Sequence, residues 1–230
     1  QAMTTAHYNV EPHAASYGPH PRQMGATSAV PASLGIVEGG GIPYNEQGRR
    51  QRDLNKADAH NLDPLTKCYM PGIPRANYLP FPFQIIQSTD VVLVAYEFAE
   101  SNRIVYVDQP ELESQVDAWM GHSNAYWEGD TLVVSVSGQM ENTWFDRAGN
   151  HHSYQMVVEE RWTPMGANHI QYEATMTDAN TFTAPWKVSF PIYRHVDENM
   201  QLLEFKCAEF SEEFLYGEFR KEGTPIGNPE

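Results

Sequence analysis

The chain has 230 residues, of which 41% are hydrophobic and 12% aromatic, enough for one sizeable core rich in aromatic side chains. Its 15 basic and 30 acidic residues give a formal net charge of −15, which argues against binding to nucleic acid or to anionic membrane surfaces. No apolar run approaches the length that spans a bilayer.

The first fifty residues differ in composition from the rest of the chain. They are rich in Pro and Gly and follow neither the strand nor the helix period, which predicts an extended arm. An arm without a core of its own must lie on its own domain or on a neighbouring subunit. The polar stretch 45–64 then predicts a short helix that ends before Pro64. We therefore divide the chain into an arm with a short helix at 1–60 and a β-domain at 61–230.

Short alternating runs follow from about Leu79, at the roughly ten-residue spacing of an antiparallel barrel or sandwich. They are PFQIIQ, VVLVAYEF, RIVYVD, SNAYWE, DTLVVSVS, YQMVVEERW, HIQYEATMT, PWKVSFPIYR and QLLEFKCAEF. PELESQVDAWM and SEEFLYGEFRK are the two short stretches with a helical pattern in this part. The prediction is an all-β, antiparallel, lipocalin-like barrel of about eight to ten strands with one or two short helices, and with room for one small ligand or a packed core.

The start of the chain and its two cysteines suggest a compartment. The chain begins at Gln1 without an initiator Met, and we expect a mature exported protein, periplasmic or extracellular, whose signal peptide has been removed. Cys68 and Cys207 fit that compartment as one disulfide. Two free buried thiols are the alternative, and the cysteine spacing matches no zinc motif.

The stretch FDRAGNHHSYQMVVEERW, residues 145–162, joins paired histidines to a strand-like run. Strand alternation places Glu160 on the same face as Val158 and Trp162, the more apolar face, so we expect Glu160 to point inward. A buried carboxylate needs a partner or else becomes protonated.

The partner of Glu160 has to come from another strand or loop, because Arg161 lies on the opposite face. Lys187, Arg194 and His152 are the candidates. One interpretation is a catalytic acid–base pair of His152 and Glu160 in the barrel mouth. The other is a structural ion pair that closes one end of the barrel.

A metal site is a minority interpretation of the same histidines. His122, His151 and His152 would supply imidazoles, and Glu160 a carboxylate. No HxH or HExxH spacing supports this arrangement, so we predict no metal and no other cofactor.

An aromatic-lined pocket is the second candidate site. Such a pocket would suit an apolar or aromatic ligand, and ordinary core packing is the equal alternative. Its candidate residues are His122, Tyr126, Trp127, Trp144, Trp162 and Trp186.

The motifs DPLTKCYMPGIPRANYLPFPFQI, WMGHSNAYWEGDTLVVSV, TWFDRAGNHHS and LLEFKC give the chain a family resemblance. Over roughly residues 60–215 it resembles a large family of exported bacterial proteins of unknown function. The resemblance implies a signal peptide and a β-rich domain, and it implies no reaction. It places the following residues at motif positions: Cys68, Trp127, Gly129, Asp130, Asp146, His152, Ser153, Glu160, Arg161, Trp186 and Cys207.

Two hypotheses about function follow. In the first, an exported barrel binds, and in one version transforms, a small apolar or aromatic molecule. In the second, the domain is a subunit of an extracellular oligomer or filament, in which residues 1–50 pack on a neighbouring copy and add a strand to an exposed sheet edge. The sequence names no reaction, and we leave open whether the protein is an enzyme.

Overall fold

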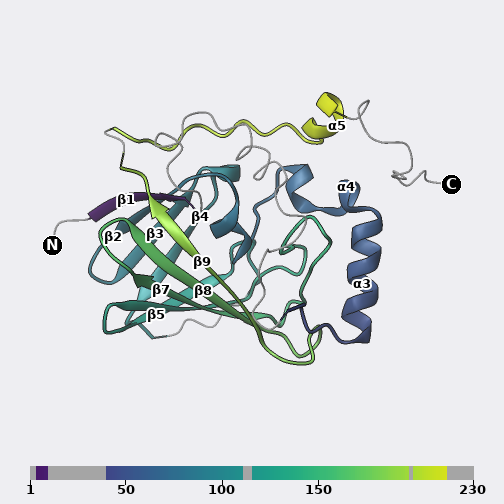
Figure 1. Cartoon of the computed structure of the whole chain (residues 1–230), viewed down its shortest axis with the longest axis horizontal. Coiled ribbons are helices and arrows are strands. Elements are labelled where there is room, and N and C mark those ends of the chain that lie inside the picture. The colour runs from purple at the N-terminus through teal and green to yellow at the C-terminus, as the bar shows by residue number, and fades with distance from the viewer. Residues whose placement is uncertain (1–3, 10–39, 111–115, 197–198, 217–230) are drawn as a thin grey trace.

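A computed structural model describes residues 4–9, 40–110, 116–196 and 199–216 of the chain. Within these residues the chain forms a closed barrel in which each strand pairs with the next in sequence, and β1 also pairs with β9 (Figure 1). The strands are β1 (Thr4–Asn9), β2 (Phe83–Gln87), β3 (Val91–Tyr96), β4 (Asn102–Val107), β5 (His122–Glu128), β6 (Thr131–Ser137), β7 (Val157–Pro164), β8 (His169–Thr177) and β9 (Trp186–Arg194). The predicted all-β barrel is confirmed.

Two details of the predicted barrel were wrong. β4 and β5 are parallel, with Val105 opposite Ser123 and Val107 opposite Ala125. Residues 201–210 (QLLEFKCAEF) alternate like a strand but form no strand in the structure. Most of their side chains are exposed, and a disulfide and an aromatic contact hold the segment in place of a strand ladder.

Strand β1, which completes the barrel, comes from the N-terminal arm. β1 pairs with β2 over five residue pairs, from Thr4 opposite Gln87 to Tyr8 opposite Phe83. It pairs with β9 over two more, so it fills the space between the two strands that would otherwise be edges. Residues 10–39 lie outside the described residues.

Strand alternation gives the barrel its core. Buried and less buried side chains alternate along β3 and β4 and along β7 from Val157 to Trp162, as expected for strands with one face toward the interior. The inward face of β7 carries Val158, Glu160 and Trp162, which confirms the predicted orientation of Glu160. This interior is one continuous cluster of buried apolar residues from all strands for which side chains are described.

The helical elements gather at one end of the barrel and along its side (Figure 1). The predicted helix within 45–64 is confirmed as α3 and α4, and the predicted C-terminal helix as α5. The stretch 110–120 lies partly outside the described residues, and its described part is not helical. The elements are α3 (Glu46–Ala57), α4 (Ala59–Leu62), η1 (Pro64–Lys67), η2 (Arg75–Tyr78), η3 (Phe98–Glu100) and α5 (Ser211–Tyr216).

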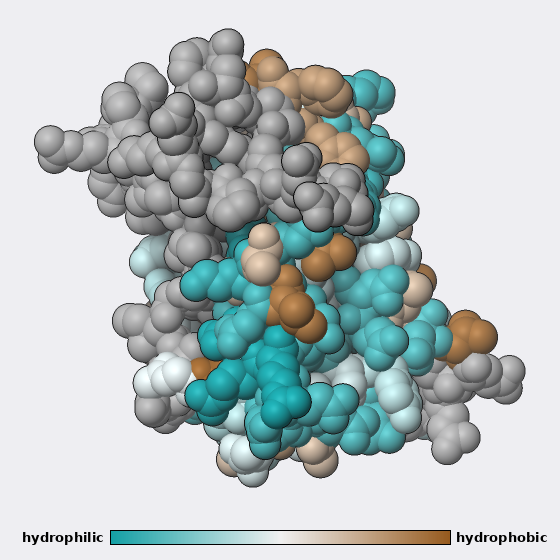
Figure 2. Space-filling view, turned by 90° about the vertical axis from the view of Figure 1, so that its right-hand side faces the viewer, coloured by the Kyte–Doolittle hydropathy of each residue, from teal (hydrophilic) through white to brown (hydrophobic). Residues whose placement is uncertain are grey.

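We call the end of the barrel at which β8 ends and β9 begins the closed end. Helix α3 lies beside it. Gly48 comes so near to the chain that follows β8 that a Cβ at this position would lie 2.6 Å from the carbonyl oxygen of Thr181. Figure 2 shows this side of the molecule mainly in hydrophilic colours, with hydrophobic residues scattered among them. No helix in the described part of the chain is long and apolar enough to cross a membrane.

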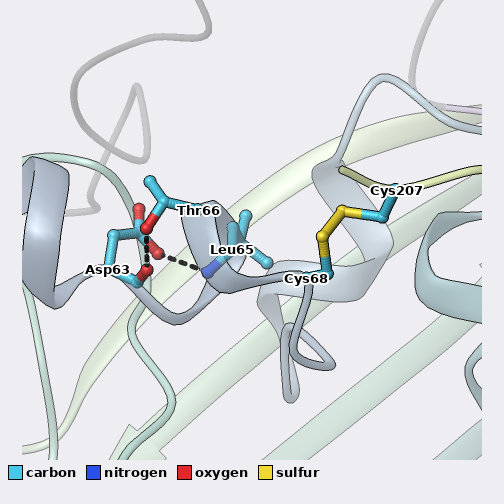
Figure 3. Close-up of a disulfide and its surroundings, with 5 residues drawn as sticks. All are labelled: Asp63, Leu65, Thr66, Cys68 and Cys207. Carbon is cyan, nitrogen blue, oxygen red and sulfur yellow. Dashed lines mark hydrogen bonds between the residues drawn. A yellow bond between two sulfur atoms is a disulfide. The ribbon is translucent and has the colours of Figure 1, made fainter. Parts of the chain in front are cut away.

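The predicted disulfide between Cys68 and Cys207 is confirmed (Figure 3). Its Cα atoms lie 5.8 Å apart, although the two residues are 139 positions apart in the sequence. Cys68 follows η1, at whose start the Asp63 side chain accepts a hydrogen bond of 3.0 Å from the backbone N–H of Leu65. The bond ties the segment after β9 to this side of the barrel.

Candidate ligand site

Glu160 is the centre of a buried polar cluster in the middle of the barrel. Its side chain is fully buried, and one carboxylate oxygen accepts hydrogen bonds from Asn77 Nδ2 at 2.9 Å and from the Tyr172 hydroxyl at 2.7 Å. Arg103 on β4 donates to both oxygens, at 2.7 and 3.2 Å. A carboxylate that meets only donors in this way suits the ionised form.

The surroundings keep this cluster neutral overall. Burial raises the pKa of Tyr172 well above its ordinary value, and the negative charge of Glu160 adds to the effect, so the phenol stays protonated. Burial alone would lower the pKa of Arg103, but the attraction of Glu160 outweighs it, and the net result is a raised pKa. Burial likewise raises the pKa of Tyr96, whose hydroxyl donates to Asn77 Oδ1 at 2.8 Å. One positive and one negative charge therefore cancel inside the barrel.

The cluster fixes the segment 72–78 inside the closed end. Asn77 reaches Glu160 from this segment, and the Gln139 side chain binds both the N–H and the C=O of Ile73, at 2.9 and 3.0 Å. Arg75 makes a two-bond ion pair with Asp63, with both distances 2.8 Å and both side chains almost completely buried. The closed end is therefore packed and hydrogen-bonded.

An apolar cavity of about 160 Å³ lies inside the barrel, next to the buried polar cluster. Most of its walls are inward-facing aliphatic side chains. Arg103 of the buried polar cluster, called the central cluster below, and Trp162 border it, and Trp127 stands half-exposed at its rim. The lining residues are Ile85, Gln87, Val92, Val94, Arg103, Val105, Trp127, Leu132, Val134, Trp162, Pro164 and Ile170. The cavity lies toward the β2–β3, β5–β6 and β7–β8 hairpins, away from α3.

A broader groove of about 530 Å³ lies on the outer wall, where β4 and β5 pair over only three residues. His122, Trp119 and Asn124 line it, and Arg103 borders it as well as the inner cavity. His122 Nε2 lies 3.0 Å from the carbonyl oxygen of Val116. This places His122 outside the barrel, away from the inner cavity that the sequence suggested for it.

The two residues of the predicted acid–base pair, His152 and Glu160, have different hydrogen-bond partners. His152 Nδ1 donates to the Ser153 carbonyl at 2.8 Å, and Nε2 lies 2.7 Å from the Thr143 hydroxyl and 3.2 Å from Gln139 Nε2. Burial lowers the pKa of His152 to about 4, so the ring is neutral at pH 7. In the described part of the chain His152 shares no hydrogen bond with Glu160. A catalytic role for the two stays a prediction, and their contacts favour a structural one.

His151 joins α3 to the barrel. Its Nε2 lies 2.9 Å from the Gly48 carbonyl oxygen, and its backbone N–H donates to the Tyr44 hydroxyl at 3.0 Å. His122, His151 and His152 thus have separate surroundings. Among the residues whose positions are described, no three His, Cys, Asp or Glu side chains gather as a bound metal ion would require.

The six predicted pocket residues divide into three groups. Trp127 and Trp162 line the inner cavity. Trp144 and Trp186 are buried toward the closed end, where Trp186 packs edge-on against Phe145 with ring centroids 5.0 Å apart. His122 lines the outer groove, and Tyr126 is exposed on the outer face of β5.

Sequence reasoning missed the true partner of Glu160. The candidates were Lys187, Arg194 and His152, and the structure supplies Arg103. The run RIVYVD could have indicated Arg103 as the partner, because alternation puts Arg103 on the same face as two buried valines. Asn77 and Tyr172 carried no comparable signal, since an Asn in a loop and a Tyr in a strand are both common in packed cores.

Comparison with known proteins returned no matching family model, no similar curated protein and no similar solved structure.

Proposed function

We propose that the protein binds a small apolar or aromatic molecule in the inner cavity of the barrel. The observation that carries this proposal is the composition of the cavity walls. The cavity has a volume of about 160 Å³, and most of its lining residues are aliphatic or aromatic. Small-molecule sites are concave and mostly apolar, with a few placed polar groups.

The central cluster supports this role because it gives the cavity one rigid wall. Four hydrogen bonds hold the Glu160 carboxylate, and the Arg103 guanidinium lies 5.9 Å from the ring centre of Trp162. A wall held in this way keeps its shape when a ligand enters, so the protein loses less conformational entropy on binding. Trp127 at the rim of the cavity is 41% exposed as a residue.

We also propose that the protein works outside the cytoplasm. The Cys68–Cys207 disulfide supports this, because disulfides persist in oxidising compartments. A net charge of −15 is compatible with a protein that stays in solution there.

A matched pair of isoleucines on β2 tests the binding proposal. Ile85 lines the cavity, whereas its neighbour Ile86 is not among the lining residues and alternates to the outer face. We expect toluene, a neutral probe with one ring, to bind the wild type in isothermal titration calorimetry. Ile85→Phe should weaken its affinity at least tenfold by filling the cavity, and Ile86→Phe should not. Equal affinity in both variants would place the probe elsewhere, and absence of binding to the wild type would contradict the proposal.

Self-assembly through the arm is the second candidate function, and the position of β1 favours it. β1 fills the space between β2 and β9, and residues 10–39 separate it from the next described residue. A connection of this length can reach as far as about 100 Å when extended, so a β1 strand from a second copy can reach the same position. Exchange of one strand between identical copies is a known route to oligomers.

A designed cross-link distinguishes the two positions of β1. Thr5 and Ile86 are register partners in β1 and β2, so Thr5→Cys with Ile86→Cys should form a disulfide. Under exchange, non-reducing gels of the oxidised protein would show chains joined into dimers and longer ladders. Cross-links confined to single chains at all protein concentrations would exclude this second function and leave the barrel closed by its own strand.

A further inference from the structure

We propose that the ligand of the inner cavity is a small neutral molecule, of the size of one ring, that carries a single carbonyl-type oxygen acceptor. Ketones, aldehydes and esters are the chemical class. This inference rests on the proposed function, since it concerns the same cavity, and it adds what the ligand must offer to the cavity walls.

Two N–H donors of lining residues have no protein partner in the described part of the structure. They are Arg103 Nε and Trp162 Nε1. Both side chains are almost completely buried, with 4% and 6% of their residue surface exposed. A buried donor without an acceptor costs free energy, and native proteins contain few of them. An acceptor oxygen brought by a ligand would satisfy one or both.

The charge of the cluster selects a neutral acceptor. The terminal nitrogens of Arg103 already bind the Glu160 carboxylate at 2.7 and 3.2 Å, so its positive charge is balanced. A ligand carboxylate would bring a second negative charge close to Glu160 in a poorly solvated interior, where like charges repel strongly. The indole N–H of Trp162 can only donate. A carbonyl oxygen accepts from either donor without adding charge.

The size of the cavity limits the apolar part of the ligand. A volume of about 160 Å³ is close to that of an engineered protein cavity of about 150 Å³ that accepts one benzene molecule. Drug-sized ligands occupy larger pockets, of about 300 Å³ and more. One six-membered ring, or a chain of similar volume, therefore fits in the cavity.

The chain offers a matched control for the indole donor. Trp186 Nε1 is also buried without a partner among the described residues, but Trp186 packs at the closed end and does not line the cavity. Trp162→Phe and Trp186→Phe thus remove the same kind of donor and keep an aromatic ring. They differ in whether a ligand in the cavity can use the donor.

The experiment compares the affinities of three ligands of one shape for the wild type and both variants by isothermal titration calorimetry. Acetophenone has the carbonyl, α-methylstyrene replaces its oxygen with a methylene group, and benzoate adds the charge. We expect acetophenone to bind about 3- to 10-fold more tightly than α-methylstyrene, the gain of one net hydrogen bond, and benzoate to bind most weakly. Trp162→Phe should reduce the preference for acetophenone, and Trp186→Phe should preserve it.

Each contrary result has a separate meaning. Equal affinity for acetophenone and α-methylstyrene, with probe binding intact, would overturn the carbonyl inference and leave the proposed function standing. Tightest binding of benzoate would overturn the requirement for a neutral ligand. A preference that survives in Trp162→Phe and disappears in Trp186→Phe would also contradict the inference. Absence of probe binding to the wild type would remove the proposed function itself.

Discussion

Replacement of Arg103 by Met is the sharpest test of the buried cluster. The change keeps a side chain of similar length but removes the positive charge and both hydrogen bonds to Glu160. Asn77 and Tyr172 would still donate to the carboxylate. The folded state would then hold a buried negative charge that no cation balances.

The expected loss of unfolding free energy follows from the burial of the ion pair. The Arg103 and Glu160 side chains are 2% and 0% exposed, and removal of one partner from such a pair costs about 3–5 kcal/mol of unfolding free energy. The exposed pair of Arg161 and Glu128, with side chains 34% and 47% exposed, supplies the control. Arg161→Met should cost at most about 1 kcal/mol, because solvent screens an exposed ion pair.

Urea unfolding followed by tryptophan fluorescence measures both effects at pH 7. Glu160→Gln combined with Arg103→Met removes both charges, so the double variant should be more stable than Arg103→Met alone by about 1–3 kcal/mol. A penalty for Arg103→Met as small as that for Arg161→Met would refute the reasoning. So would a double variant whose loss equals the sum of the two single losses, since the charges would then not interact.

Three further predictions concern the stability and association of the barrel. Burial lowers the pKa of His152 from about 6.5 in an unfolded chain to about 4. The contribution of the neutral His152 ring to stability is therefore complete above pH 6.5 and is lost as the pH falls toward 4. Between pH 7 and pH 5 the wild type should lose about 2 kcal/mol that His152→Gln does not lose, measured by urea unfolding at both values; equal losses would contradict this. Replacement of Cys68 and Cys207 by Ser should lower stability by at most about 5 kcal/mol, the chain-entropy limit for a 139-residue separation, and an unchanged unfolding midpoint would show that the bond constrains little. Removal of residues 1–39 should leave β2 and β9 as open edges and cause concentration-dependent association in light scattering; a stable monomer at all concentrations would show that β1 does not protect them.

The sequence predicted the barrel because alternation is a local property. Eight of the nine strands lie in runs where apolar side chains recur at every second position. The same rule oriented Glu160 correctly, since its neighbours at positions 158 and 162 are Val and Trp. These features need no knowledge of which strands meet.

The missed features depend on contacts between distant parts of the chain. β1 has little strand pattern of its own, and the two edges beside it favour its extended form. The parallel pairing of β4 and β5 depends on the path of the connection between them. Arg103 and Glu160 are 57 positions apart, and only the closure of the barrel brings them together. The position of the cavity follows from the same closure.

The most direct test of the central claim uses the five tryptophans of the chain as local probes. Two of them, Trp127 and Trp162, line the inner cavity, Trp119 lines the outer groove, and Trp144 and Trp186 lie toward the closed end. Protein with ¹⁵N-labelled tryptophan gives one indole N–H signal for each in a two-dimensional NMR spectrum, and single Trp→Phe variants assign them.

On addition of acetophenone, we expect the signals of Trp127 and Trp162 to shift together with one saturation curve, while those of Trp144 and Trp186 stay in place. A shift of the Trp119 signal alone would move the site to the outer groove. No shift at Trp127 or Trp162 with acetophenone, and none with toluene, would contradict the claim that this barrel binds its ligand in the inner cavity.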